Sequence, residues 1–411
     1  MVLLGTLDTK GEEYAYLARQ VRETGCEVVL IDAGTLGSPL TTPTIGREEV
    51  AQAADADAAA LAAAGDRGAA ITAMARGATV VVGRLYAAGR LHAILGLGGS
   101  GGTTLVTEAM RALPIGVPKL MVSTVASGDT RPYVGATDIT MMFSVVDIAG
   151  INRFSARILS NAAAAIVGMA QSFAAAATEP EADAKPLIGA TMFGVTTDCV
   201  TTARHLLEER GYEVLVFHAV GTGGQALEAL IAGGFLAGVL DATTTELADE
   251  LVGGILSAGP SRLTAASKVG LPQVVSLGAL DMVNFGPRET VPPQFQDRKL
   301  YVHNASVTLM RTTPAECAEL GRRVAARIGG SAGPLAVFVP LRGVSAIATE
   351  GGVFYDPEAD RALFAALREG LGDGPGAGIE VHELDLAIND PAFATAMAER
   401  LLALIAEQGA R

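Results

Sequence analysis

The sequence predicts an α/β protein with two Rossmann-like parallel-sheet domains and a cleft between them. Three observations support this fold class: apolar strand-like runs alternate with helical patterns, the chain repeats its own plan, and glycines directly follow a buried strand. Strands that alternate with helices form parallel sheets covered by helices on both faces. A chain of 411 residues is long enough for two or three domains with cores of their own.

The first half begins with a strand, a helix and a second strand. Residues 2–9 contain the first strand and its turn, the helix ends near Gly25, and residues 26–31 form the next strand. Gly25 suits the position just after a helix, because glycine tolerates the left-handed backbone there. The second half repeats this order with residues 188–197, Gly211 and residues 212–217.

Two later strands repeat as well. Residues 91–97 correspond to residues 238–241, and each run leads into a turn of small or hydroxyl side chains and a helix. Residues 116–123 and 270–276 both place a Gly-x-Pro turn before a buried strand. Because ligands of such folds bind at the carboxyl ends of parallel strands, both halves are expected to contribute to the cleft.

Residues 174–186 mark the boundary between the halves, since they are charged, contain two prolines and lack apolar periodicity. We predict an N-terminal nucleotide-binding domain over 1–178, a linker over 179–186 and a C-terminal domain over 187–411. The C-terminal domain is expected to end with a strand over 379–384 and a helix over 391–407.

The composition excludes several classes of partner. The net charge is −14 and the basic residues are scattered, so nucleic acid and acidic membrane surfaces are poor partners. Three cysteines without a CxxC pair, and no signal peptide, predict reduced thiols in a cytoplasmic protein. No apolar stretch free of charges and turns is long enough to span a bilayer, and the alanine-rich segments 51–64 and 162–177 predict soluble helices.

A glycine-rich segment follows the apolar run at residues 92–97, and a helical pattern begins on its far side. The free N–H groups and the positive dipole end of that helix can hold an anion. The alternative is a tight turn that only allows the helix to pack on the sheet. We expect a phosphate group to bind at Gly98, Gly99, Ser100, Gly101, Gly102 and Thr103.

Two nucleotide motifs match this segment only in part. Gly96, Gly98 and Gly101 satisfy G-x-G-x-x-G, but the next strand, residues 119–124, ends in hydroxyls instead of the acidic residue of a dinucleotide site. A P-loop would need a lysine after Gly101. Both the NAD and the Walker-type interpretation are therefore weakened, whereas phosphate binding is not.

The same glycines satisfy G-x-S-x-G, the nucleophile elbow of α/β-hydrolases, with Ser100 as the nucleophile. That interpretation needs a downstream acid and a histidine. Glycines on both sides of Ser100 are also more than an elbow requires. A Ser100 hydrolase stays an alternative.

Asp8, Thr9 and Lys10 follow the first strand and are further candidates for nucleotide binding. Lys10 is the candidate countercharge for phosphate and a candidate catalytic residue, and Asp8 is a candidate ligand of Mg²⁺ or of a ribose hydroxyl. The alternative is that Asp8 or Thr9 caps the following helix.

A second loop, after the strand at 119–124, is expected beside the glycine-rich segment. It contributes Ser127, Gly128 and Asp129 to the nucleotide site. Asp129 is the candidate Mg²⁺ ligand and acid–base residue, with a helix cap as the alternative.

The second half supplies the candidates for substrate binding. Asp241 and Thr243 take the place of the glycines and suit a hydroxylated or acidic metabolite, and Asp281 takes the place of Asp129. Arg311 and Arg342 each follow an apolar strand and are candidates for binding a carboxylate, or for tying loops together by salt bridges. His303, at the start of a strand-like segment, is a candidate catalytic residue, although a lone histidine is more often structural.

Several motifs together resemble the Tm-1-like ATP-binding family, also called UPF0261. They lie at residues 5–11, 96–104, 123–130, 147–152, 303–313, 340–344 and 354–360, and so cover nearly the whole chain. The resemblance implies that the N-terminal region binds ATP and forms homodimers. It also implies a TIM-barrel partner as a separate protein, because a plant member carries such a barrel after this region.

We therefore expect an ATP-binding protein, with Mg²⁺ as a second cofactor, that acts on a small carboxylate metabolite in the cleft. ATP or another phosphate ligand would drive that reaction. Two alternatives stay open: a regulatory or interaction protein that responds to ATP without consuming it, and a metabolite enzyme that needs no nucleotide.

Overall fold

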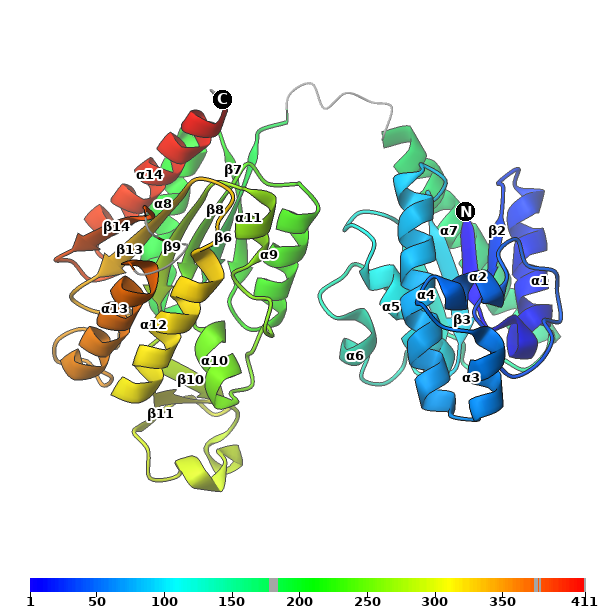
Figure 1. Cartoon of the computed structure of the whole chain (residues 1–411), viewed down its shortest axis with the longest axis horizontal. Helices are drawn as coiled ribbons and strands as arrows, with labels where there is room; N and C mark the ends of the chain where they lie inside the picture. Colours follow the sequence, from blue (N-terminus) through cyan, green and yellow to red (C-terminus); the bar gives the residue numbers. More distant parts are fainter. Residues whose placement is uncertain (177–183, 373–375, 377, 410–411) are drawn as a thin grey trace. The chain divides into compact units, whose positions relative to one another are not determined.

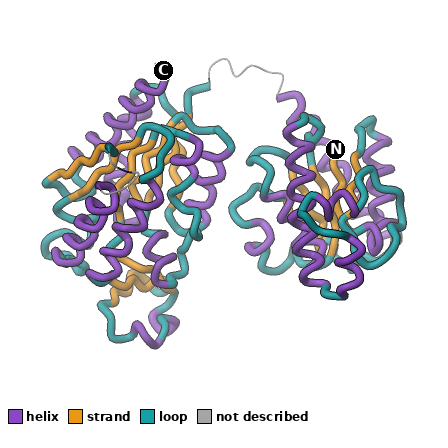
Figure 2. The backbone as a smooth tube through the Cα atoms, viewed as in Figure 1, coloured by secondary structure: helices purple, strands orange, loops and turns teal. Residues whose placement is uncertain are grey.

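The computed structural model describes residues 1–176, 184–372, 376 and 378–409. The chain forms two compact units, Met1–Ala182 and Asp183–Arg411. Each is an α/β unit with a large parallel sheet and helices on both faces (Figures 1 and 2). Most of the predicted linker lies outside the described residues, and the predicted cleft between the halves stays a prediction.

The N-terminal unit has five strands and seven helices among its described residues. Along the chain these are β1 (Val2–Gly5), α1 (Leu7–Glu23), β2 (Val29–Asp32), α2 (Arg47–Gln52), α3 (Ala58–Ala64), α4 (Arg67–Ala87), β3 (Ile94–Gly98), α5 (Ser100–Arg111), β4 (Lys119–Ser123), α6 (Arg131–Val134), β5 (Thr140–Phe143) and α7 (Arg153–Ala176). The strands are parallel and have the order β2-β1-β3-β4-β5.

Alternate side chains of β1 show how the layers are built. Val2 and Leu4 pack with residues of α2, α4 and α5, whereas Leu3, and Met1 just before the strand, pack with residues of α1 and α7. A strand with buried side chains on both faces is expected in a parallel sheet between two helical layers. The apolar runs of the sequence are the strands of this sheet.

The C-terminal unit contains the remaining elements. They are β6 (Leu187–Met192), α8 (Thr197–Glu209), β7 (Glu213–His218), α9 (Thr222–Ala232), β8 (Gly238–Thr243), α10 (Glu246–Val252), α11 (Ala265–Val269), β9 (Gln273–Gly278), β10 (Met282–Phe285), β11 (Leu300–Asn304), β12 (Val307–Arg311), α12 (Pro314–Ile328), β13 (Leu335–Pro340), α13 (Pro357–Gly372), β14 (Glu380–Leu384) and α14 (Pro391–Gly409). Short 3-10 turns lie at Gly194–Thr196, Arg288–Thr290 and Pro293–Phe295.

The strand orders confirm that the two halves share one plan. The large sheet of the C-terminal unit has the order β7-β6-β8-β9-β13-β14, and its strands are parallel. The first four positions match β2-β1-β3-β4 of the N-terminal unit, as the sequence predicts. Gly25 and Gly211 both have positive φ, 84° and 90°, just after α1 and α8.

The alternating pattern does not predict the three-stranded antiparallel sheet β10-β12-β11. A hairpin joins β11 to β12, and the Asn304 side chain accepts the N–H of Ser306 at 2.8 Å in its turn. This turn divides a run that reads as one strand. The predicted position of His303 is therefore wrong: His303 lies near the end of β11 and does not begin a strand.

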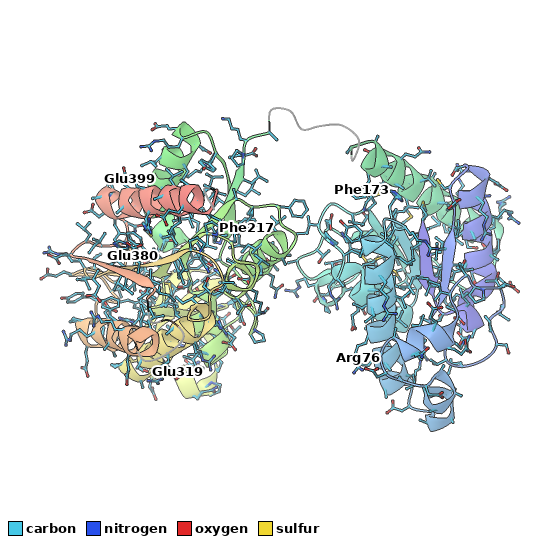
Figure 3. The ribbon with its side chains drawn as sticks, turned by 45° about the horizontal axis from the view of Figure 1, so that its top comes forward. Arg76, Phe173, Phe217, Glu319, Glu380 and Glu399 are labelled. Atoms are coloured by element: carbon cyan, nitrogen blue, oxygen red, sulfur yellow. The ribbon has the colours of Figure 1, made fainter. Side chains whose placement is uncertain are left out.

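Helix α7 is long and apolar enough to cross a membrane by length and composition. Leu159, Ala162, Ile166 and Val167 on one of its faces are buried against the first sheet and α1. The prediction that no apolar stretch is long enough to span a bilayer is therefore wrong for α7 by this test, whereas the predicted helix is present. The core helix of a soluble protein passes the same test. Phe173, labelled in Figure 3, lies near the end of α7.

Candidate functional site

The first predicted site lies where neighbouring strands of the N-terminal sheet separate. The pairing of β1 with β3 ends at Leu4 and Gly96, and the chain passes from β1 to β2 on one side and enters β3 on the other. Doubly wound sheets bind ligands at such a switch point. Tyr14 of α1 fills its base, where the hydroxyl accepts the N–H of Leu97 at 2.8 Å and lies beside the Leu4 carbonyl.

The glycine-rich segment forms the end of β3 and the first turn of α5. Gly99 is the N-cap and the helix begins at Ser100, so that Gly101 and Gly102 lie in its first turn. The first N–H groups of a helix have no partner inside it, and they form the positive end of the helix dipole. A Cβ on Gly98 would lie 3.0 Å from the Gly102 Cα, so Gly98 also allows the helix to approach the strand closely.

Arg67, the first residue of α4, lies near this helix end. A Cβ on Gly101 would be 3.8 Å from a guanidinium nitrogen of Arg67, and both residues line one small pocket. Arg67 is exposed, and no ion pair or hydrogen bond engages its guanidinium among the described residues. A free guanidinium next to a helix N-terminus is well suited to bind a phosphate.

Two carboxylates, Asp32 and Asp8, accept N–H groups of the segment after β2, whose residues Ala33, Thr35 and Leu36 line this pocket. Asp32, at the end of β2, accepts the N–H of Leu7 at 3.0 Å and pairs with Arg47 at 2.7 Å. Asp8 accepts the N–H of Leu36 at 2.6 Å through Oδ2. Oδ1 of Asp8 has no hydrogen-bond partner among the described residues, although this side chain is only 2% exposed.

A larger pocket of about 730 Å³ adjoins the small one, and both are lined by Thr35 and Leu36. Residues 35–39, Arg47, Glu48 and Gln52 of α2 and the first turn of α3 form its walls. Small-molecule sites have volumes of roughly 300–1,000 Å³. The carboxyl edge of this sheet thus combines a helix N-terminus and an unpaired guanidinium with an adjoining pocket of ligand size.

The other predicted residues of the first half lie in different surroundings. The Lys10 ammonium donates to the carbonyl of Ile148, in the loop before α7, and does not line the small pocket. Thr103 is buried, with its hydroxyl 2.6 Å from the Ser123 hydroxyl. Asp129 is exposed and ion-paired with Arg131 at 2.8 Å, and hydrogen bonds from Arg131 lower its pKa.

The remaining candidates of the first half are surface residues of loops and helix ends. Thr9 is exposed and its hydroxyl lies 2.8 Å from that of Thr6, and it lines the small pocket together with Asp8. Ser127 and Gly128 are exposed in the turn after β4. Lys10 itself interrupts the helical geometry of α1, with φ −127° and ψ 20°.

Ser100 lacks the surroundings of a hydrolase nucleophile within the N-terminal unit. The strained elbow of those enzymes is not present, because Ser100 begins α5 and is not among the described residues with positive φ. His92 is the one histidine in residues 1–182. It precedes β3 and therefore lies at the opposite end of that strand from Ser100.

Asp241 and Thr243 are buried at the corresponding edge of the C-terminal unit. Arg262, whose side chain is fully buried, donates to both carboxylate oxygens of Asp241 at 2.5 and 2.6 Å. The Thr243 hydroxyl lies 2.8 Å from that of Thr196, and its N–H donates to Thr191 at 2.9 Å. At the edge where the N-terminal unit has its glycine-rich segment, the C-terminal unit thus has side chains that bond to one another. Binding of a substrate at this edge stays a prediction.

The predicted arginines both take part in ion pairs. Arg311 is buried and pairs with Asp360 at 2.7 Å, whereas Arg342 is exposed and pairs with Asp385 at 2.7 Å. Both arginines thus form the salt bridges that the sequence analysis gives as the alternative to binding a carboxylate ligand. His303 is exposed, and its ring lies 6.4 Å from that of Tyr301.

Two buried carboxyl groups of the C-terminal unit are expected to make its stability depend on pH. Burial raises the pKa of Asp249, which accepts hydrogen bonds from Asn284, to about 7. Burial also raises the pKa of Asp281 to about 6, and its Oδ1 has no hydrogen-bond partner among the described residues. Between about pH 4 and these values the folded state binds protons that an unfolded chain has released.

Stability should therefore fall as the pH rises from 5 to 8. Asparagine does not titrate, so Asp281→Asn removes the contribution of this carboxyl group to the pH dependence of the free energy of unfolding. Relative to the unchanged protein, this variant should gain on the order of 1 kcal/mol between pH 5 and pH 8. Urea unfolding at both pH values measures the difference, and parallel pH profiles would contradict the assignment.

The sequence reasoning missed Arg67, Arg47 and Asp32. A signal for two of them exists, because a segment rich in Gly, Ser, Thr and Pro follows the predicted strand at 26–31 directly. Such a segment at the carboxyl end of a strand next to β1 indicates a ligand loop. No local signal marks Arg67, since only the packing of α4 against α5 brings it to Gly101.

Comparison with protein-family models covers both units. Residues 1–175 match the N-terminal domain, and residues 185–405 the C-terminal domain, of an uncharacterised protein family, UPF0261. The chain belongs to the UPF0261 family. It is 52% identical over 403 residues to a UPF0261 protein of Clostridium tetani, covering 98% of both chains. A UPF0261 protein of Rhizobium meliloti is 50% identical over 395 residues, or 96% of both.

A tomato protein extends the relationship to plants. The ToMV susceptible protein tm-1(GCR26) of Solanum lycopersicum is 40% identical over 422 residues, which cover 99% of this chain and 56% of the tomato protein. The resemblance to the Tm-1-like UPF0261 family is therefore confirmed. The bacterial relatives match this chain over nearly their full length, whereas the tomato protein is much longer.

Proposed function

We propose that the N-terminal unit binds the phosphate groups of a nucleotide, ATP with Mg²⁺, at the first turn of α5. The contact that carries this proposal is the unpaired guanidinium of Arg67 beside Gly101. It adds a positive charge to the free N–H groups of Gly101 and Gly102 at a helix N-terminus. Arg67 thus takes the role of countercharge that the sequence suggests for Lys10.

The neighbouring groups fit the remaining parts of a nucleotide. Mg²⁺ keeps several waters and needs one or two carboxylates beside the phosphates, and Asp8 lines the same pocket. Its Oδ2 lies 3.8 Å from Arg47, and its buried Oδ1 has no hydrogen-bond partner among the described residues, so a ligand reaches Oδ1 only if the side chain shifts. Among the described residues no cluster of three acidic, histidine or cysteine side chains could hold a metal by itself. The Asp8 oxygen alternatively accepts a ribose hydroxyl, and the pocket of about 730 Å³ takes the base.

Beyond binding, the proposal includes an enzyme that uses the nucleotide on a small carboxylate metabolite. Phosphate release in the presence of candidate acids separates this from a regulatory protein that binds ATP without consuming it. Homodimers, a cytoplasmic location and a TIM-barrel partner stay predictions.

The test is thermal unfolding and calorimetric titration with MgATP, MgADP, NAD and inorganic phosphate. A ligand at one hundred times its Kd should stabilise the folded unit by about 2.7 kcal/mol, which raises its Tm by roughly 5–10 °C. Arg67→Gln should weaken MgATP binding at least about tenfold, because a charge-assisted hydrogen bond is lost.

Two matched controls accompany this variant. Arg84→Gln changes an exposed arginine at the other end of α4 and should leave MgATP binding unchanged. Lys10→Ala should also retain binding, because its ammonium is held by Ile148. No Tm shift with any phosphate ligand at millimolar concentration, or equal binding by Arg67→Gln, would overturn the proposal.

A further inference from the structure

The C-terminal unit has a pocket of about 640 Å³ that the proposed nucleotide site does not include. One wall is a single face of α13, because Pro357, Asp360, Arg361, Phe364, Ala365 and Arg368 recur at helical spacing. The other wall is Leu341 and Arg342, just after β13, with Glu350 and Tyr355 of the following loop. The pocket therefore opens between the exit of a parallel strand and the first turns of the next helix.

Three guanidinium groups line this pocket in a chain of net charge −14. Arg342 pairs with Asp385, and Arg368 pairs with Glu383. Arg361 is exposed and has no ion pair or hydrogen bond among the described residues. The free positive charge in the pocket is thus that of Arg361.

The charged residues that line the pocket favour a single carboxylate over a polyphosphate as its ligand. A polyphosphate needs several free cations or N–H groups, and here two of the three arginines already hold carboxylates. The carboxylates of Glu350 and Asp360 also line the pocket and would repel a dianion. Arg311, which does not line the pocket, partly neutralises Asp360 through an ion pair of 2.7 Å between its guanidinium and Oδ1 of Asp360. One free guanidinium beside two acids fits a single carboxylate, which arginine binds through two parallel hydrogen bonds.

The apolar lining defines the rest of the ligand. Tyr355 is 41% exposed and Leu341 is 39% exposed, and Phe364 is buried behind them. A ring-sized apolar body that covers these side chains gains free energy in proportion to the area it removes from water. The acids Glu350 and Asp360 can accept a hydrogen bond from a hydroxyl or amino group on that body.

We propose that this pocket binds a small aromatic or branched monocarboxylate, with Arg361 holding the carboxylate and Tyr355 covering the apolar body. The site is independent of the nucleotide proposal, since its residues all belong to the C-terminal unit. It makes Arg361, which the sequence motifs did not single out, a ligand-binding residue.

Calorimetry and ligand-observed NMR of the full chain with benzoate and 4-hydroxybenzoate test this site. Both probes should bind with a Kd below about 1 mM, and 4-hydroxybenzoate should bind more tightly because its hydroxyl reaches an acid. Benzyl alcohol, the neutral analogue, should bind at least about tenfold more weakly. Inorganic phosphate and ATP at equal concentration should not displace the carboxylates.

Variants locate the binding. Arg361→Gln should weaken both carboxylates at least about tenfold without changing the Tm, because Arg361 is exposed and unpaired, and Tyr355→Ala should weaken them several-fold. Arg322→Gln is the matched control: this exposed arginine on α12 pairs with Glu319, labelled in Figure 3, at 3.0 Å. Absence of binding at 10 mM, equal binding by Arg361→Gln, or displacement by phosphate would overturn the proposal.

Discussion

Replacing Arg262 by methionine is expected to destabilise the C-terminal unit by about 3–5 kcal/mol, because it leaves buried carboxylates without their partner. The guanidinium donates to Asp241 at 2.5 and 2.6 Å and to Glu246 at 2.6 Å, and its side chain is fully buried. Both carboxylate side chains are at most 3% exposed. Urea unfolding of the variant and the unchanged protein measures the difference.

The pH dependence separates this cause from a simple packing defect. Burial raises the pKa of Glu246, and Arg262 opposes that rise. Without Arg262 the folded-state pKa rises further, so the variant should be least stable above pH 7 and should recover toward pH 5 relative to the unchanged protein. A triple variant, Asp241→Asn, Glu246→Gln and Arg262→Met, should regain part of the loss. A loss that is constant from pH 5 to pH 8 would exclude the unpaired carboxylates as its cause.

Gly5→Ala is expected to destabilise the N-terminal unit by about 2–4 kcal/mol, the sum of overpacking and a lost buried hydrogen bond. A Cβ at this position would lie 2.1 Å from the Tyr14 hydroxyl oxygen. Tyr14 is fully buried and cannot move aside, and its hydroxyl satisfies the Leu97 N–H between the separating strands. The substitution should also weaken MgATP binding, since Tyr14 forms the base of the switch point.

A matched glycine in the same unit provides the control. A Cβ on Gly83 of α4 meets no atom within 4 Å, so Gly83→Ala should be neutral or stabilising by up to about 1 kcal/mol. Tyr14→Phe isolates the hydrogen bond and should cost about 1–3 kcal/mol. If Gly5→Ala and Gly83→Ala gave equal Tm values, the close contact between Gly5 and Tyr14 would not exist in solution.

Much of the fold could be predicted from the sequence, because its strands are buried on both faces. The Gly-x-Pro turns and apolar residues of 116–123 and 270–276 indicate parallel strands, and glycines such as Gly25 and Gly211 indicate helix ends. The antiparallel sheet could not be predicted, since its strand β11 is mostly exposed and lacks an apolar run. The hairpin at Asn304 decides where that segment turns.

The candidate site was predicted only in part. The position of the glycine-rich segment in the fold could be predicted because a strand, the glycines and a helix follow one another along the chain. The charges around it could not be assigned in the same way: Lys10 is near in sequence but is held by Ile148, while Arg67 is distant in sequence and lies at Gly101. Sequence distance says little about which long side chain reaches a ligand.

The sequence by itself determined the two-unit α/β architecture, its internal repeat, its family and the edge of the sheet where an anion is expected to bind. Those properties follow from local periodicity and from glycines next to strands. Only the tertiary structure decided which charges are free. Asp241, Arg262 and Arg311 form buried ion pairs within the C-terminal unit. Arg67 and Arg361 are exposed and form no ion pair among the described residues. The physical reason is that a side chain is available to a ligand only when no neighbour from another element satisfies it first, and the chain order does not show those neighbours.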